Sequence, residues 1–401
     1  MKVTTDEPPG KPAIIVDQTL RVLIVAASLD IMGGQAVQAA KLVHYLKEEP
    51  TVTVGFLPVN PRLPGVLRKL QSVKYLRTIT TSILYWVNLL KTVPKFDVIH
   101  IFSASYLSFL LAPTPAILVG RIFGKRIILN YHSGEAEEHL RLWPRSSMPL
   151  LRIADEIIVP SNYLVRVFAQ FGLIAKAIFN VIELDQLVFR ERRPLSPVFL
   201  SNRNFQVHYG VDTVLRAFAI IQERFAGASL TVIGDGPCHP ALIQLSTELQ
   251  LENVRFTGTI EHDRMPMMYN ESDIFLNASR LDNQPLSILE AFASGLPVIT
   301  SDAGGIPDMV INDKTGFIVP INDHVALARK AIQLVEEPSI AQGVVAQARR
   351  ECWKYTWGAV RDEWLTAYTG TLDQSAKNSR LVQFETHQAP KKDGKEACEI
   401  N

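Results

Sequence analysis

The chain has 401 residues, 47% of them hydrophobic, and a formal net charge of +1. This length is enough for two sizeable cores, and the near-zero net charge gives no argument for nucleic-acid binding. The three cysteines are far apart and odd in number, which argues against a disulfide framework or a cysteine metal site and favours a reducing cytosol.

The first residues are polar and show neither a signal-peptide pattern nor apolar periodicity. We therefore expect a cytoplasmic protein with a flexible tail at 1–18. Residues 373–401 also lack apolar periodicity and predict a second tail.

Short apolar runs alternate with amphipathic segments along the rest of the chain. The first series of expected strands covers 21–27, 51–57, 96–102, 125–131, 155–160 and 177–182. After a charged, proline-rich stretch at 190–197, the second series covers 197–201, 228–233, 253–257, 273–277, 297–301 and 316–319. Strands of this kind between helices indicate parallel sheets covered on both faces. The expected fold class is therefore α/β, with two doubly wound, Rossmann-like domains facing across a cleft.

The loop after the first expected strand contains adjacent glycines, Gly33 and Gly34, and leads into an amphipathic segment at 35–48. Adjacent glycines allow a backbone to approach a ligand closely. The loop does not have the G-x-G-x-x-G fingerprint of dinucleotide-binding proteins, and no acidic residue ends the next strand. This pattern counts against a nicotinamide-dependent oxidoreductase.

The segment from Thr51 to Phe96 contains no aspartate or glutamate, and apolar residues are interleaved with its basic ones. The basic residues are Arg62, Arg68, Lys69, Lys74, Arg77, Lys91 and Lys95. A basic amphipathic helix can lie on an anionic membrane surface. The alternative is a helix packed on the sheet with its lysines in solvent, and both interpretations stay open.

The apolar stretch 101–122 is long enough to be mistaken for a membrane span. Its serines and prolines divide it into a strand end and a helix after Pro113, so we expect a buried β–α unit.

Polar residues follow three of the expected strands: His132, Arg203 and Asp235. Parallel sheets bind ligands at the carboxyl ends of their strands, and in a two-domain chain these ends meet at the cleft. An arginine there suits a bidentate phosphate contact. His132 as a packing residue and Asp235 as part of a simple turn remain alternatives.

The stretch from Asp282 to Glu290 places one carboxylate in a loop and a second in a short helix. Pro285 suits the first position of that helix, and Ser294-Gly295 suits its end. A second glycine turn follows at Gly304-Gly305. Loop-to-helix junctions present free N–H groups that attract phosphate, although ordinary capping would also explain the pattern.

These residues, taken in chain order, resemble glycosyltransferase family 4, whose members are retaining transferases with the GT-B fold and use nucleotide-sugar donors. The resemblance covers roughly residues 20 to 370. Its most specific element is the E-x7-E signature, which this chain matches in spacing with Asp282 and Glu290, although the first acid is aspartate.

The resemblance implies a role for each of these residues. Glu290 would bind the donor ribose, Asp282 the hydroxyls of the transferred sugar, and Arg203 the diphosphate. His132 would line the sugar site from the first domain, and Thr259 would lie against the nucleobase. The further donor-binding residues would be Gly33, Gly34, Asp235, Pro285, Leu286 and Ser287. No cofactor or metal is implied, because N–H dipoles and an arginine can stabilise the leaving group.

Two departures from the family pattern stand out. Aspartate at 282 is one methylene shorter than the usual glutamate. The family's usual lysine a few residues after the arginine is absent from the stretch 203–210, where His208 or Asn204 are the candidate substitutes. These departures motivate the alternative function, a catalytically weak sugar-nucleotide-binding or scaffold protein of the same fold.

The resemblance also implies a domain division. The first domain, on the acceptor side, would cover 19–190, the donor domain 191–355, and a helix at 356–372 would cross back to the first domain. The acceptor would be a lipid-linked glycan or polysaccharide, reached from the inner face of a membrane if the basic segment binds lipid.

Overall fold

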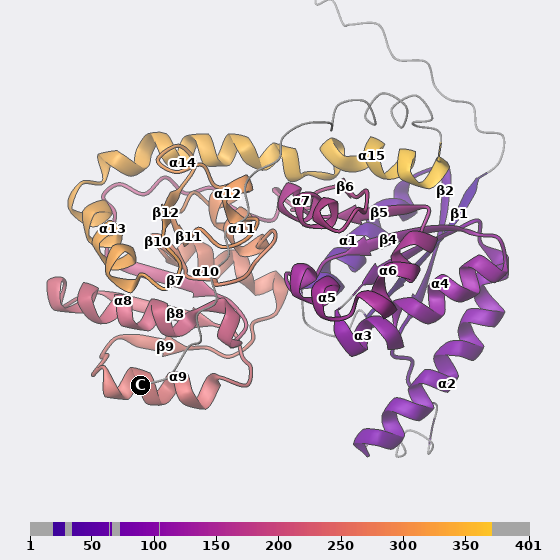
Figure 1. Cartoon of the computed structure of the whole chain (residues 1–401). Coiled ribbons are helices and arrows are strands. Elements are labelled where there is room, and N and C mark those ends of the chain that lie inside the picture. The colour runs from indigo at the N-terminus through magenta and orange to yellow at the C-terminus, as the bar shows by residue number, and fades with distance from the viewer. Residues whose placement is uncertain (1–18, 29–33, 64, 66–72, 104, 371–401) are drawn as a thin grey trace, which may run out of the picture.

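The computed structural model describes residues 19–28, 34–63, 65, 73–103 and 105–370. Within these ranges the chain forms two six-stranded parallel sheets, each covered by helices (Figure 1). This arrangement confirms the α/β fold class predicted from the alternating apolar runs. The expected tails lie outside the described residues.

The first sheet has the strand order β2-β1-β3-β4-β5-β6. Its strands are β1 (Leu20–Ala26), β2 (Val52–Pro58), β3 (Val98–Ser103), β4 (Arg126–Tyr131), β5 (Glu156–Val159) and β6 (Lys176–Ala177). The helices of this part are α1 (Gly34–Glu48), α2 (Lys74–Thr92), α3 (Tyr106–Leu111), α4 (Pro113–Ile122), α5 (Ala136–Leu142), α6 (Pro144–Ile153) and α7 (Asn162–Gln170).

The second sheet has the order β12-β11-β10-β7-β8-β9. Its strands are β7 (Val198–Asn202), β8 (Ser229–Ile233), β9 (Val254–Phe256), β10 (Ile274–Asn277), β11 (Val298–Ser301) and β12 (Phe317–Val319). Its helices are α8 (Val211–Arg224), α9 (His239–Glu248), α10 (Met265–Glu271), α11 (Leu286–Ala293), α12 (Ile306–Met309), α13 (His324–Glu336) and α14 (Ser339–Glu351). The last helix, α15 (Trp357–Thr369), follows them.

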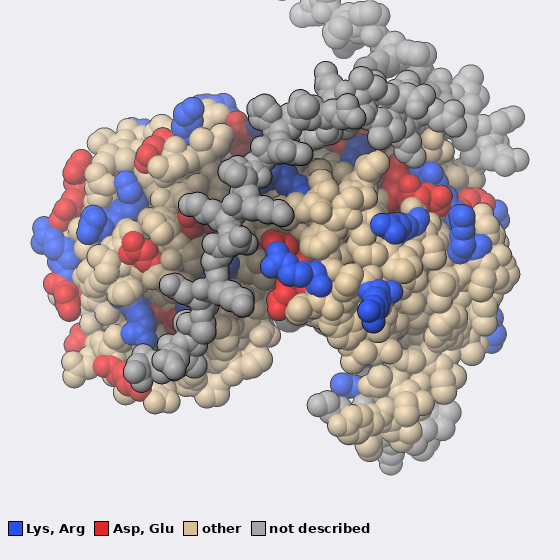
Figure 2. All heavy atoms as spheres, viewed as in Figure 1, with Lys and Arg blue, Asp and Glu red and all other residues tan. Residues whose placement is uncertain are grey.

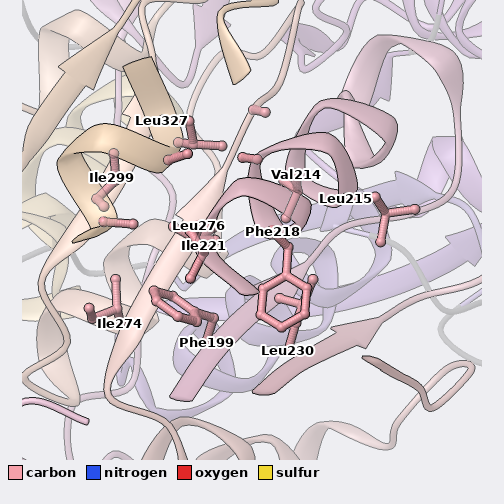
Figure 3. Close-up of a cluster of buried hydrophobic side chains, with 14 of the residues drawn as sticks. Phe199, Val214, Leu215, Phe218, Ile221, Leu230, Ile274, Leu276, Ile299 and Leu327 are labelled. Atoms are coloured by element: carbon pink, nitrogen blue, oxygen red, sulfur yellow. The ribbon is translucent and has the colours of Figure 1, made fainter. Parts of the chain in front are cut away.

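The central strands are runs of apolar residues buried on both faces, as parallel sheets require. All six residues of β3 are buried, for example. In the second domain, Phe199 of β7 packs edge-on against Phe218 of α8, with ring centroids 6.2 Å apart (Figure 3). Each domain therefore has its own core, and the strand-end loops are held by rigid elements.

The expected strand 177–182 is wrong in length, because β6 ends at Ala177. The backbone beyond it hydrogen-bonds elsewhere. Asn180 N donates to the Gln284 side chain. Val181 N donates to Gln38 Oε1, and Val181 O accepts from Gln38 Nε2. Ile182 N donates to Tyr355 O. These residues form the crossing between the domains, where side chains replace a sheet neighbour.

The apolar stretch 101–122 divides as expected into the end of β3 and the helices α3 and α4. Ala116, Ile117 and Val119 are buried in the first domain's core. Among the helices of the described residues, none combines the length and apolar character that crossing a bilayer would require.

Helix α15 packs on the first sheet, although it follows the second domain in sequence (Figure 1). Its residues Val360, Trp364 and Tyr368 share one buried cluster with Val22 and Ile24 of β1. Arg361 also pairs with Glu49 just after α1, with an Nε to Oε1 distance of 2.6 Å. The chain therefore crosses between the domains twice.

Candidate functional site

A cleft of about 1280 Å³ is lined by the strand-end loops of both domains. Most of the site residues expected from the sequence line it: Gly34, His132, Arg203, Thr259, Asp282, Pro285, Leu286, Ser287 and Glu290. Gly33 lies outside the described residues. The structure thus brings together residues that are up to about 250 positions apart in the sequence, because the carboxyl ends of the two sheets face one cleft.

Arg203 and Asp282 form an ion pair inside the cleft, between Nη2 and Oδ2. Arg203 also lies over the Tyr209 ring, 4.2 Å from its centroid, and its Nη1 is 3.4 Å from Ser287 Oγ. The Asp282 Oδ1 accepts the Asn283 N–H at 2.9 Å. Burial raises the pKa of the Asp282 carboxyl, and the positive charge of Arg203 opposes that rise.

The second glycine turn supports the Asp282 loop. The Gly305 N–H donates to Asp282 O at 2.9 Å. A Cβ at Gly304 would stand 2.1 Å from Asp282 O, and one at Gly305 would stand 2.1 Å from Asn283 O. The Gly305 N–H is therefore engaged by the backbone and is not free for a ligand. Close backbone packing requires glycine at both positions.

Glu290 lies in α11, as expected, and Pro285 is the residue before this helix instead of its first residue. The buried Glu290 carboxylate accepts the Tyr269 hydroxyl at 2.7 Å through Oε2. Asn202 Nδ2 in turn donates to the Tyr269 hydroxyl at 3.2 Å. Burial raises the pKa of Tyr269 well above its usual value, so the phenol keeps its proton. Tyr269 therefore holds Glu290 in one orientation.

Asp235 is the one expected site residue among the described ones that does not line the cleft. Its Oδ1 accepts the Gly236 N–H at 2.8 Å and lies 3.0 Å from His239 Nδ1. A Cβ at Gly234 would stand 2.0 Å from Arg203 O. The turn therefore supports the backbone of Arg203, and the simple turn alternative holds for Asp235.

His132 enters the cleft from the first domain. Its ring stacks on Phe102, with centroids 5.1 Å apart, and its main-chain O accepts Asn283 Nδ2 from the second domain at 2.9 Å. Burial lowers the pKa of His132 to about 4, so the imidazole is neutral near pH 7. A neutral imidazole can contact sugar hydroxyls as donor and as acceptor.

Sequence reasoning missed three charged residues of the cleft: Lys41, Glu183 and Glu135. The buried Lys41 of α1 pairs with Glu183, with an Nζ to Oε2 distance of 3.5 Å. Gln38 and Lys41 are polar residues one helical turn apart on the buried face of α1. This polar pair on a buried face is the signal that could have identified Lys41. Glu135, two residues past Ser133, also lines the cleft.

Two protein families match the chain, one for each domain. The family described as "Glycosyl transferases group 1" matches residues 188–351, and "Glycosyltransferase Family 4" matches residues 32–186. The chain belongs to the group 1, family 4 glycosyltransferases. The resemblance noted in the sequence is therefore confirmed.

Similar proteins give this family membership a context. The sulfoquinovosyl transferase SQD2 of Arabidopsis thaliana is 27% identical over 292 residues, which are 66% of this chain and 55% of that protein. A GDP-mannose-dependent alpha-(1-6)-phosphatidylinositol monomannoside mannosyltransferase of Mycobacterium tuberculosis is 32% identical over 148 residues, covering 34% of this chain and 38% of that protein. The chain spans about half the length, or less, of these curated relatives.

Solved structures support the GT-B architecture. HepE of Anabaena, crystallised with UDP and glucose, has a TM-score of 0.68 at 17% identity. The alignment covers 88% of this chain and 100% of that one. At such identity the similarity shows the fold alone, and it confirms the two facing Rossmann-like domains predicted for this glycosyltransferase family member.

Proposed function

We propose that this family member transfers a hexosyl or related sugar from a nucleotide-diphosphate sugar to a glycan or lipid-linked acceptor. One observation carries the proposal: a single cleft is lined by Gly34 and His132 of the first domain and by Arg203, Asp282 and Glu290 of the second. The similar HepE of Anabaena has been crystallised with UDP and glucose and with UDP-glucose, which supports a nucleotide-sugar donor.

The donor would bind along the second domain. Glu290, fixed by Tyr269, would bind the ribose hydroxyls through its other carboxylate oxygen, and Thr259 would lie against the nucleobase. The diphosphate would lie near Arg203 and the first turn of α11, where the N–H groups of Leu286 and Ser287 have no earlier helical carbonyl to bond. Asp282 and His132 would contact the transferred sugar from opposite domains.

In the reaction, the bond between the sugar C1 and the diphosphate oxygen breaks, and a bond between C1 and the acceptor oxygen forms. The acceptor hydroxyl's proton passes to the leaving phosphate. Arg203 and the helix N–H groups stabilise the negative charge that develops on the diphosphate, so we propose that no metal is needed. Within the described residues, no three His, Cys, Asp or Glu side chains are grouped as a metal site would require.

We further propose retention of the sugar's anomeric configuration. A double displacement needs a free carboxylate nucleophile next to the sugar. Three of the four acids that line the cleft have partners: Glu183 pairs with Lys41, Asp282 with Arg203, and Glu290 with Tyr269, whereas the fourth, Glu135, comes from the first domain. This pairing supports a route in which the acceptor attacks from the face that the diphosphate leaves.

A donor panel tests the proposal. The full chain is heated with UDP-, GDP- and ADP-sugars and with the bare nucleotides, and stabilisation identifies the ligand by mass action. Donor hydrolysis and acceptor glycosylation are then measured, and NMR of the product reports the anomer. Glu290→Ala should lose binding. Unchanged binding and turnover in that variant would contradict the assignment.

The second candidate is a sugar-nucleotide-binding protein with weak catalysis. The observation that favours it is the absence of a lysine after Arg203, where Tyr209 stacks on the guanidinium and His208 lines the cleft. Tight donor binding without turnover, with any acceptor offered, would select this candidate.

The acceptor side of the proposal includes contact with an anionic membrane. Helix α2 projects from the first domain (Figure 1), and much of its apolar side is exposed to solvent. The exposed apolar residues on or next to α2 are Val73, Tyr75, Leu76, Ile79, Ile83, Trp86, Val87 and Leu90. Such a surface is far more apolar than a solvated helix needs.

The charge around α2 complements an anionic bilayer. Residues 51–134 contain ten lysines and arginines and a single acid, Asp97, which pairs with Arg21. Helix α2 packs on α4, whose end adds the exposed Ile122. In Figure 2, the part of the first domain that carries α2 is tan with blue lysine or arginine side chains and shows no red acidic ones. The lipid-linked acceptor implied by this surface agrees with the phosphatidylinositol-based acceptor in one relative's name.

A further inference from the structure

The guanidinium of Arg203 is neutralised by partners within the protein. Its Nη2 pairs with Asp282, its Nη1 lies 3.4 Å from Ser287 Oγ, and its face covers the Tyr209 ring. The Arg203 and Asp282 side chains are only 11% and 12% exposed. A diphosphate that approaches Arg203 would therefore meet an adjacent buried carboxylate of like charge.

Asp282 cannot move away freely, because its own loop holds it. Its Oδ1 accepts the Asn283 N–H at 2.9 Å, its Oδ2 accepts the Ser279 hydroxyl at 3.3 Å, and its main-chain O accepts the Gly305 N–H. The aspartate side chain also has one torsion fewer than a glutamate in the same place. The carboxylate thus stays beside Arg203 unless another donor satisfies it.

We propose that Asp282 competes with the diphosphate for Arg203, and that the hydroxyls of the donor's sugar relieve this competition by hydrogen-bonding Asp282. This inference rests on the proposed function and deepens it. The sugar hydroxyls of the intact donor can replace Arg203 as the hydrogen-bond partner of the Asp282 carboxylate. The bare nucleoside diphosphate lacks this sugar and offers no such replacement. Recognition of the sugar is thereby coupled to stabilisation of the leaving group, and the nucleotide product binds weakly.

Calorimetric titration of the full chain with UDP, GDP and ADP, and with their sugar conjugates, tests the inference. Asp282→Asn keeps the side chain's shape and removes its charge. We expect it to bind the cognate nucleoside diphosphate at least about tenfold tighter than the unmodified chain, and to lose most of the extra affinity that the sugar provides. Asp282→Glu keeps the charge and serves as the control, with weak nucleotide binding retained.

The expected gain in affinity for the nucleoside diphosphate must depend on Arg203. In an Arg203→Gln background, Asp282→Asn should give no gain, so the double-mutant cycle shows coupling between the two residues. Equal or weaker nucleotide binding by Asp282→Asn, or the same gain without Arg203, overturns the inference while leaving the proposed function intact. If neither form binds any nucleotide or nucleotide sugar, the proposed function fails and this inference with it. Asp282→Ser repeats the test if the asparagine variant does not fold.

Discussion

At the scale of single residues, three acids of the cleft are each held by a side chain from another part of the fold. Tyr269 holds Glu290, Arg203 holds Asp282, and Lys41 holds Glu183. Burying a charge without a partner costs free energy. The partner side chains therefore stabilise the carboxylates and also fix their positions. Tyr269 is a positioning residue, because it acts on the donor only through Glu290.

Tyr269→Phe should weaken donor binding about tenfold and change kcat little. The variant leaves Glu290 Oε2 without its hydrogen bond, which is worth about 1–2 kcal/mol. Tyr85→Phe is the matched control, since the buried Tyr85 hydroxyl donates to Ala112 O at 2.9 Å, outside the cleft lining. The control should lower stability and leave KM unchanged. Equal KM changes in both variants would show that Tyr269 is merely structural.

The pH profile of transfer should show no acid limb from His132 above about pH 5. Burial holds the pKa of His132 at about 4, below its usual value of 6.5, so the imidazole remains neutral through the assay range. The measurement is kcat/KM between pH 5 and 8 for the unmodified chain and for His132→Gln. A limb near pH 6.5 that disappears in the variant would contradict the neutral assignment.

At the scale of secondary-structure elements, α2 is the helix whose surface the domain's own packing does not explain. Tyr85, Leu89 and Val93 fall on one side and are buried in the first domain's core. The exposed apolar residues lie on the remaining surface together with Arg77 and Lys91. One helix thus has a core side and a second apolar side, which an isolated soluble domain does not require.

The intact protein should float with vesicles that contain phosphatidylglycerol and not with pure phosphatidylcholine. Charge reversal of Arg77 and Lys91 should reduce binding several-fold for each residue, because a basic residue near such a surface contributes about 1 kcal/mol. Ile83→Asp should abolish flotation. Ile243→Asp, at an exposed site on α9, is the matched control and should float normally. Flotation that is absent, or unaffected by these changes, would refute the membrane proposal.

At the scale of the whole molecule, α15 joins the two domains by packing on the first sheet. His100 of β3 lies at this contact, with its ring 4.8 Å from Trp364. Asn130 Nδ2 donates to His100 Nε2 at 3.0 Å, so Nδ1 carries the proton and donates to the Tyr368 hydroxyl at 2.9 Å. Burial lowers the pKa of His100 to about 3.

Stability should therefore fall as the pH drops from about 6.5 towards 3. The unfolded chain, with an ordinary histidine pKa, takes up a proton in this window that the folded chain does not, so stability rises with pH there. The whole effect of His100 is on the order of 5 kcal/mol. Urea unfolding at pH 7 and pH 5 should show a smaller pH difference for His100→Gln. An identical difference in both proteins would contradict this origin.

Much of the fold could be predicted from the sequence, because burial on both faces produces short apolar runs that local patterns reveal. All twelve expected strands occur, and only 177–182 was substantially too long, since its backbone bonds to Gln38 of α1 and to Gln284 and Tyr355 of the second domain instead of a neighbouring strand. The loop and helix of Asp282 and Glu290 were also predictable, because turn and cap residues act over a few positions.

The two-domain α/β fold, the family and the strand-end loops that face the cleft could all be derived from the amino-acid sequence. The partners of the cleft residues could be identified only in the folded chain. Arg203 pairs with Asp282 across 79 positions, Gly305 gives its N–H to the Asp282 backbone, and Asp235 supports a turn outside the cleft lining. Periodicity is a property of neighbouring residues, whereas a side chain's partner depends on which distant segments the two cores bring within hydrogen-bonding distance.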